Sequence, residues 1–381
     1  MKLKKKYQLL LVIRWPVGGI RTFIRYVYKT FDSQRYSITI IAPDLPELKL
    51  LLNDLDGFNV TCILVDKNPT NKKFYITILK TLNLCKFDVI HSHGFTAAVF
   101  SVLASFLFQT PHIVTLHEIL NDNQFLGMRG KCKKIMLSVL LPLVDYIHLV
   151  SNDARNNLLR HIKVLRLFQS KLVVIPNGIE IDRFKKENKC NLRKELALED
   201  NSFLIGFFGR FMPAKGFDYL IDAIDILYKK ISLPKRPIVV AFGEGAYIRE
   251  EKQYVIQKHL EKFVFFMPFV HDVSSFLKGM DVVAIPSLWE TCPILPMEAM
   301  VSGVPIIATN CIGLREVISN TPARVVPPRD SKALANSILQ EMKLPSRERM
   351  KVFSKRAEEM FNVNKYSSQI ENLINDLANR K

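Results

Sequence analysis

Short apolar runs rich in β-branched residues alternate with longer stretches of helical periodicity along the whole chain. In the first half, the apolar runs predict strands at residues 8–14, 37–42, 61–65, 88–91, 112–116, 146–150 and 172–175. A second series follows at residues 203–208, 238–242, 264–267, 282–285, 305–308 and 323–326. The alternation predicts an α/β protein with parallel sheets that carry helices on both faces.

The break between the two series falls at Pro176-Asn177-Gly178, which is a turn sequence, and a polar, charged segment follows at 185–200. A chain of 381 residues is also too long for one ordinary core. We therefore expect one domain at residues 1–178 and a second at 179–360. The tail at 365–377 has the periodicity of a helix, with apolar residues at 366, 370, 373, 374 and 377.

No stretch of the sequence predicts a transmembrane helix. The apolar run at 95–108 has about 14 residues, which fits a buried helix better than a membrane span. The basic start of the chain resembles the first part of a signal peptide. However, Arg14 interrupts the short apolar run that follows and Gly18-Gly19 ends it, so we interpret this run as a first strand.

Charge and cysteine content narrow the class of protein. The net charge is +18, and up to Pro176 there are 24 Lys and Arg against 11 Asp and Glu. No nucleic-acid motif accompanies this excess, so an anionic membrane surface or an acidic acceptor is the expected partner. The six cysteines are scattered without a CxxC pair, which predicts reduced thiols and neither a disulfide framework nor a zinc site.

Two segments, 129–141 and 155–168, join basic residues to an apolar face. Each is either an amphipathic helix that rests on anionic lipid or a helix with a buried apolar face and a solvated basic face.

Two glutamates follow the predicted strand at 282–285. Glu290 lies in a loop, and Glu298 lies near the start of a helix that is predicted to begin at Pro296. Open α/β sheets bind ligands at the carboxyl ends of their strands, so these carboxylates are well placed to hold hydroxyl groups of a ligand. The alternative for Glu298 is a structural role, because a carboxylate in the first turn favours the helix dipole.

Two cations, Arg210 and Lys215, lie in a glycine-containing turn between the strand at 203–208 and a helix predicted at 217–228. Arginine binds phosphate oxygens as a fork and lysine as a point charge, and a helix start adds amide donors. The turn, which includes Gly209, therefore predicts a diphosphate site, with a pair of solvated charges as the alternative.

With Arg210, Lys215, Glu290 and Glu298 in this order, the chain resembles glycosyltransferase family 4, a family of retaining enzymes with the two-domain GT-B fold. The matching stretches are PVGGI at 16–20, DVIHSHG at 88–94, TLHE at 115–118, VIPNGI at 174–179, GFFGRFMPAKG at 206–216, FGEG at 242–245 and EAMVSGVPIIAT at 298–309. The resemblance covers nearly the whole chain. It implies two Rossmann-like domains that face a central cleft, with the C-terminal helix returning so that 361–381 completes the first domain.

The resemblance also implies a role for each matched side chain. Arg210 and Lys215 would hold the donor diphosphate and stabilise negative charge on the departing nucleotide. Glu290 would lie near the hydroxyls of the donor sugar, and Glu298 would accept hydrogen bonds from the ribose hydroxyls. His117 would lie beside the donor sugar.

Backbone groups complete the implied site. Gly19, in a loop of the first domain, would let the backbone approach the phosphates, and the turn at Gly243 would lie beside the nucleotide, as would Gly209. The amides of Ile294 and Leu295 would line the sugar and phosphate site. The chain departs from the family at Pro293 and Ile312, where glycine is common, and at Glu118, where aspartate is common.

Fixed cations can neutralise the departing diphosphate, so we expect neither a divalent metal nor a cofactor. Retention is implied to proceed by same-face attack, with the leaving phosphate accepting the acceptor's proton. The triplet Asp54-Leu-Asp56, a metal-site candidate in other glycosyltransferases, is predicted to be a solvated loop. His91 and His93 lack a third metal ligand nearby in sequence, which leaves a structural or acceptor-side role.

The expected function is transfer of a sugar from a UDP- or GDP-sugar to a hydroxyl of a glycan or lipid-linked acceptor. By analogy with the family, the setting is bacterial surface polysaccharide or lipopolysaccharide assembly, by a cytoplasmic protein bound peripherally to the inner face of the membrane. Two alternatives remain: a nucleotide-sugar epimerase of the same fold, and a non-catalytic basic protein that binds membrane or nucleic acid.

Overall fold

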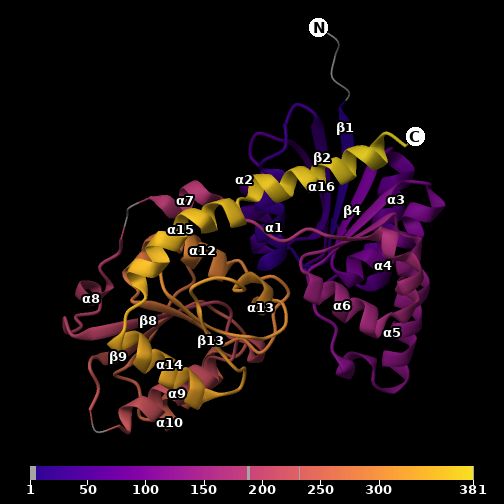
Figure 1. Cartoon of the computed structure of the whole chain (residues 1–381). Coiled ribbons are helices and arrows are strands. Elements are labelled where there is room, and N and C mark those ends of the chain that lie inside the picture. Colours follow the sequence, from indigo (N-terminus) through magenta and orange to yellow (C-terminus); the bar gives the residue numbers. More distant parts are fainter. Residues whose placement is uncertain (1–5, 187–188, 231, 381) are drawn as a thin grey trace. The chain divides into compact units, whose positions relative to one another are not determined.

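The computed structural model describes residues 6–186, 189–230 and 232–380 (Figure 1). The chain forms two compact units. The first runs to Gly178 and resumes at Val363, and the second is Ile179–Asn362. The C-terminal helix α16 (Val363–Ala378), yellow in Figure 1, thus belongs to the first unit. The returning segment begins at Val363, two residues later than the boundary at 361 predicted from the sequence.

The first unit is built on a seven-stranded parallel sheet with the order β3-β2-β1-β4-β5-β6-β7. Its strands are β1 (Tyr7–Ile13), β2 (Tyr36–Pro43), β3 (Asn59–Val65), β4 (Val89–His93), β5 (His112–Leu116), β6 (Tyr146–Leu149) and β7 (Leu172–Val174). Its other helices are α1 (Gly19–Tyr28), α2 (Pro46–Asp54), α3 (Asn71–Leu84), α4 (Phe95–Leu107), α5 (Gly127–Leu140) and α6 (Asn152–His161). Three 3-10 segments join them: η1 (Asp122–Phe125), η2 (Leu141–Leu143) and η3 (Lys163–Lys171).

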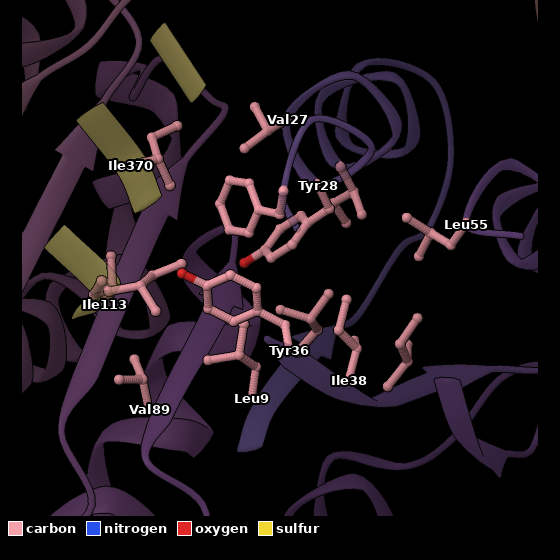
Figure 2. Close-up of a cluster of buried hydrophobic side chains, with 14 of the residues drawn as sticks. Leu9, Val27, Tyr28, Tyr36, Ile38, Leu55, Val89, Ile113 and Ile370 are labelled. Carbon is pink, nitrogen blue, oxygen red and sulfur yellow. The ribbon is translucent and has the colours of Figure 1, made fainter. Parts of the chain in front are cut away.

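Both faces of this sheet are buried along β1, β2, β4 and β5, which explains why these strands are continuous apolar runs, whereas the edge strand β3 is largely accessible. Successive side chains of a strand point to opposite faces. Leu9 and Leu11 of β1 therefore pack with residues of α1, α2 and α16, whereas Leu10 and Val12 pack with residues of α3 and α4. Figure 2 shows part of the first of these clusters, where Tyr28 of α1 and Tyr36 of β2 lie among aliphatic side chains.

The second unit has a six-stranded parallel sheet with the order β10-β9-β8-β11-β12-β13. The strands are β8 (Ser202–Phe208), β9 (Arg236–Phe242), β10 (Val264–Met267), β11 (Val282–Ile285), β12 (Ile306–Thr309) and β13 (Arg324–Val326). The helices are α7 (Ile181–Lys185), α8 (Leu192–Glu195), α9 (Phe217–Tyr228), α10 (Ile248–Gln257), α11 (Ser274–Gly279), α12 (Leu295–Val301), α13 (Leu314–Val317), α14 (Ser331–Lys343) and α15 (Arg347–Phe361), with a 3-10 turn η4 (Pro213–Lys215).

Each sheet reverses its strand order at one point, between β1 and β4 in the first unit and between β8 and β11 in the second. In open parallel sheets, ligands bind just outside the carboxyl ends of the strands at such a switch point. The candidate residues Arg210, Lys215 and Glu290 all follow β8 or β11, and His93 ends β4. The topology therefore places the candidate chemistry where this fold binds ligands.

One prediction from the sequence needs correction. Asp54 does not lie in a solvated loop, because it is the last residue of α2 and receives the Arg21 guanidinium at 2.7 Å. Leu55, which follows it, is buried in the core. The Arg21 side chain thus neutralises one carboxylate of the triplet.

Candidate active site

An ion pair between Lys215 and Glu290 lies at the centre of the candidate site. The Lys215 Nζ is 2.6 Å from the Glu290 Oε1, and the Ser287 hydroxyl donates to the same oxygen at 2.7 Å. Both charged side chains are largely buried. Together with Pro293 and Leu295 they line one pocket. The ends of β8 and β11 line the same pocket.

Backbone contacts hold the Lys215 turn against the end of β11. Gly216 has a left-handed conformation with φ of 61°, and a Cβ atom there would lie 2.3 Å from the Pro286 carbonyl oxygen. The Leu288 amide donates to the Ala214 carbonyl at 2.8 Å. Only glycine fits at position 216, because it needs both a positive φ and the missing side chain.

A second glycine contact fixes the backbone of Glu290. The Glu290 amide donates to the Ile312 carbonyl at 3.0 Å, and a Cβ atom at Gly313, whose φ is 77°, would lie 2.3 Å from the Glu290 carbonyl oxygen. Ile312 contributes through its backbone carbonyl, which any residue provides. The departure from the family pattern at this position therefore leaves the backbone support of Glu290 in place.

Gly209 and Gly243 bring two loops into close contact at the ends of β8 and β9. The Gly209 amide donates to the Phe242 carbonyl at 3.0 Å, and a Cβ atom at Gly243 would lie 2.0 Å from the Gly209 carbonyl oxygen. An added Cβ at Gly209 would itself lie 3.9 Å from the Lys215 Cε. Arg210 follows directly, and its side chain is exposed and does not line the pocket.

The helix α12 continues the site. Ile294 is its N-cap and Leu295 its first residue, and the Glu298 amide donates to the Ile294 carbonyl at 3.0 Å. Glu298 lies in the first turn and is buried. The structure thus brings Lys215, Glu290 and Leu295 around one pocket, with Glu298 one helical turn further on.

The remaining candidates, Gly19 and His117, lie in the first unit. Gly19 is the first residue of α1 and is exposed, with open space where a Cβ atom would be. His117 follows β5, and its Nε2 is 3.2 Å from the Nδ1 of His93 at the end of β4. Phe23 of α1 packs edge-on against the His117 ring at 4.9 Å between ring centroids.

His117 belongs to a buried group of five histidines that the sequence did not predict as a group: His91, His93, His112, His117 and His148. Burial lowers the pKa of His112 and His117 to about 3 and that of His148 to about 4. It also holds the pKa values of His91 and His93 well below the usual range. All five imidazoles are therefore neutral at physiological pH.

A directed hydrogen-bond chain connects several of these rings. The His148 Nε2 donates to the Ile175 carbonyl at 2.8 Å, because a carbonyl can only accept, so the His148 Nδ1 is an acceptor. The Thr115 hydroxyl then donates to that Nδ1 at 2.9 Å and accepts from the His91 Nε2 at 2.6 Å. The His91 Nδ1 in turn accepts from the Tyr28 hydroxyl at 2.6 Å. One backbone carbonyl thus sets the tautomer of both rings.

Sequence reasoning missed His112 and His148 because each lies within a predicted apolar strand, with no motif around it. The one signal in the sequence was that both histidines lie in strands that follow the predicted strand of His91. Consecutive parallel strands placed them beside the His91–His93 pair, as the register pairs His91 with Ile113 and Thr115 with His148. Among the residues that the structure describes, no group of three or more His, Cys, Asp or Glu is arranged to hold a metal ion.

Two sequence-family models match the chain in tandem. The model of the "Glycosyltransferase Family 4" matches residues 17–183, and that of the "Glycosyl transferases group 1" matches residues 188–360. Among curated proteins, a UDP-Gal:alpha-D-GlcNAc-diphosphoundecaprenol alpha-1,3-galactosyltransferase of Escherichia coli is 25% identical over 314 residues, covering 80% of this chain and 79% of that protein. The O-antigen biosynthesis glycosyltransferase WclY, also of Escherichia coli, is 25% identical over 60% of this chain and 62% of its own length.

Solved structures share the fold over nearly the whole chain. HepE of Anabaena, crystallised with UDP-glucose, has a TM-score of 0.82 at 21% identity and covers 97% of this chain and 100% of its own. Two doubly wound parallel sheets with a cation and a carboxylate at a switch point, together with these matches, define a glycosyltransferase of the GT-B type. The chain belongs to glycosyltransferase family 4, and its relatives act in bacterial glycan biosynthesis.

Proposed function

We propose that this glycosyltransferase moves a sugar from a nucleoside-diphosphate sugar to a hydroxyl group of a lipid-linked glycan, with retention of configuration and without a metal ion. The observation that carries the proposal is the Lys215–Glu290 ion pair, which lines a pocket at the switch point of the second sheet. HepE, which shares the fold, was crystallised with UDP-glucose, and the Escherichia coli galactosyltransferase is named for a diphosphoundecaprenol acceptor. Both names support the choice of substrates.

The ion pair explains how the site can stay charged and buried before the donor arrives. Each of the two charges compensates the other. When a diphosphate enters, the Lys215 ammonium can turn to it, and the Glu290 carboxylate becomes available to the hydroxyls of the donor sugar. Arg210, exposed beside the turn, can add a fork of donors to the same diphosphate. Glu298 would accept from the ribose.

The transfer step needs charge stabilisation more than it needs a base. The bond between the sugar's anomeric carbon and the phosphate oxygen breaks, and a new bond forms from that carbon to the acceptor oxygen on the same face. The acceptor's proton moves to the departing phosphate oxygen. Negative charge therefore grows on the diphosphate, where Lys215 and Arg210 oppose it.

Replacement of Lys215 tests this proposal. Removal of a fixed donor to a developing charge typically costs about 100-fold or more in rate, so Lys215→Ala should lose transfer by at least that factor. Mass spectrometry of products, with a panel of nucleotide sugars and a lipid-linked acceptor, measures it. Lys332→Ala, which removes an exposed lysine of α14, is the matched control and should keep full activity. Full activity of a folded Lys215→Ala protein would contradict the assignment.

The same assay separates a transferase from an epimerase of the same fold. With donor but no acceptor, the proposal predicts slow hydrolysis at most. A new nucleotide sugar formed without acceptor would instead identify an epimerase.

We also propose that the first unit rests on an anionic membrane. No helix in the described part of the chain is long and apolar enough to span a bilayer. Exposed apolar side chains gather on α4, α5, η2 and η3, elements that contact one another. They are Leu103, Phe106, Leu107, Met128, Ile135, Met136, Val139, Leu143 and Leu167. The exposed Arg129, Lys131 and Lys134 lie on α5, the helix that carries four members of this cluster.

The structure distinguishes α5 from α6, the helices of the two basic segments that the sequence left open, although Leu167 at the end of the second segment belongs to the exposed cluster. α5 exposes large apolar side chains, including Met128 at 77% and Ile135 at 64%, as expected of a helix that rests on lipid. In α6, by contrast, the apolar residues Ala154 and Leu158 are buried, which is the ordinary packing of a surface helix. We therefore assign the membrane contact to α5 and the segments around it.

A further inference from the structure

A buried arginine without an anionic partner lies at the carboxyl end of β1. The Arg14 side chain is 9% exposed, and its Nη2 donates to the Pro69 carbonyl at 2.8 Å. Its Nη1 is buried and has no hydrogen-bond partner in the described part of the chain. Among the residues that the structure describes, no carboxylate lies within ion-pair distance of the guanidinium. A buried charge of this kind is costly unless an opposite charge meets it.

The surroundings of Arg14 are aromatic on two sides. The guanidinium carbon lies 4.6 Å from the centre of the Trp15 ring and 5.6 Å from that of Phe74. Phe74 is buried in the core, whereas Trp15 is 43% exposed. Trp15 therefore lies between the guanidinium and solvent. Rotation of the Trp15 side chain would expose the guanidinium.

A helix starts two residues beyond Pro69. α3 begins at Asn71, just after the Pro69 carbonyl that Arg14 binds, and it runs for 14 residues. The Thr70 cap accepts from the Lys73 amide, while the amides of Asn71 and Lys72 find no acceptor among the described residues. The first turn has no acidic residue and carries the exposed Lys72 instead. Helix starts of this kind attract anions.

A purely structural role explains part of this arrangement. The Nη2 bond to Pro69 ties the loop before α3 to the end of β1. It leaves the Nη1 donor and the first-turn amides of α3 without acceptors, and the positive charge with only two aromatic rings against it, among the residues that the structure describes. A bound anion would satisfy all three at once.

We propose that Arg14, the first-turn amides of α3 and Lys72 bind a phosphoryl group of the acceptor, under a cover formed by Trp15. The inference rests on the proposed function, since it names the charged group that the lipid-linked glycan would carry. Its position agrees with that role. Arg14 directly follows Ile13, which pairs with His93 across the switch point of the first sheet.

The two tryptophans of the chain, Trp15 and Trp289, make the site directly observable. In a Trp289→Phe, Lys215→Ala protein, Trp15 is the sole tryptophan and the proposed donor site is disabled. Titration of this protein with inorganic pyrophosphate and with farnesyl diphosphate should change the Trp15 emission and saturate. Farnesol, which has the same chain without the anion, should give no such change.

Replacement of the guanidinium gives the second arm. A hydrogen bond to a charged group is worth about 1.5–3 kcal/mol, so Arg14→Gln in the same background should weaken diphosphate binding at least about tenfold. Arg14→Lys keeps the charge without the fork and should lie between the two. Should both variants fail to fold, the titration of the protein that retains Arg14 still decides the question.

A parallel titration with phosphatidylglycerol vesicles tests a bilayer headgroup as the source of the phosphoryl group. Three outcomes would overturn the inference: no Trp15 response to either diphosphate, an unchanged diphosphate affinity in Arg14→Gln, or a Trp15 response to the vesicles alone. Binding of UDP to the chain with Lys215 intact is measured in parallel. If the chain with Lys215 intact does not bind UDP, the proposed function is contradicted. If it binds UDP but Trp15 does not respond to the diphosphates, only the Arg14 site is contradicted.

Discussion

At the scale of single residues, the site depends on charges that compensate each other before any ligand is present. Glu290 holds the Lys215 ammonium at 2.6 Å, and the Ser287 hydroxyl donates to the same carboxylate oxygen. The residue types and their order could be predicted from the sequence. Their pairing could not, because the two residues are 75 positions apart and meet only since β8 and β11 are neighbours in the sheet.

The conformation of Gly216 gives a prediction at this scale. A left-handed conformation costs a non-glycine residue about 1–2 kcal/mol, and at Gly216 the new Cβ would also meet the Pro286 oxygen. We expect Gly216→Ala to lower both the free energy of unfolding and the rate of transfer, because the Lys215 turn must move. Gly127, with φ of 65° and open space around its Cβ position, is the control.

Chemical denaturation and transfer assays on the two variants provide the comparison. Gly127→Ala should cost only the backbone term of about 1–2 kcal/mol and leave the Lys215 turn unchanged. Equal losses of stability and activity in the two variants would mean that the contact between Gly216 and Pro286 has no role in positioning Lys215.

At the scale of elements, composition predicted where strands lie but not where each begins. Buried parallel strands are continuous apolar runs, so all thirteen predicted strands are present in the structure. β9 begins earlier than its apolar run because Arg236 and Pro237 pair with Ser202 and Phe203. The residues at which a strand begins and ends depend on its pairing with the neighbouring strand, and the composition of one strand does not predict that pairing. For the same reason, the histidines of three neighbouring strands could not be predicted to meet.

This histidine group predicts how stability depends on pH. The five imidazoles have depressed pKa values in the folded state, at about 3 for His112 and about 4 for His148, against about 6.5 when unfolded. Between these values the unfolded chain binds more protons than the folded one. Stability should therefore fall as pH drops below about 6.5, by about 1.4 kcal/mol per pH unit for each histidine.

Urea unfolding of the full chain between pH 8 and pH 4.5 measures this slope. His112→Gln should reduce the slope by about 1.4 kcal/mol per pH unit, whatever it does to stability at pH 8. His271→Gln, at an exposed position in the second unit, is the control for the loss of a histidine elsewhere. A slope that His112→Gln leaves unchanged would show that this ring is not held neutral by folding.

At the scale of the whole molecule, the two units carry different parts of the proposed function. The second unit holds the Lys215–Glu290 pocket, and the first holds the histidine group, Arg14 and the exposed apolar cluster. The excess of positive charge in the first half could be read from the sequence. The apolar cluster could not, because burial decides which apolar residues of an amphipathic segment are left on the surface.

Vesicle binding tests the membrane contact. The protein should stay with vesicles that contain anionic lipid at low salt and leave them at high salt, since salt screens the attraction. Ile135→Glu, in the exposed cluster, should weaken retention, whereas Val352→Glu, at an even more exposed position on α15, should not. Equal retention on neutral vesicles would contradict the electrostatic part of the account.

The central claim is that Lys215 and its neighbours bind the diphosphate of a nucleotide donor. Isothermal titration of the full chain with UDP and with GDP, in the absence of divalent metal, tests it most directly. We predict saturable binding of at least one of the two nucleotides, weakened at least about tenfold in Lys215→Ala, which removes a charge-assisted contact, and unchanged in Lys332→Ala. Binding that is equally tight in Lys215→Ala would contradict the claim.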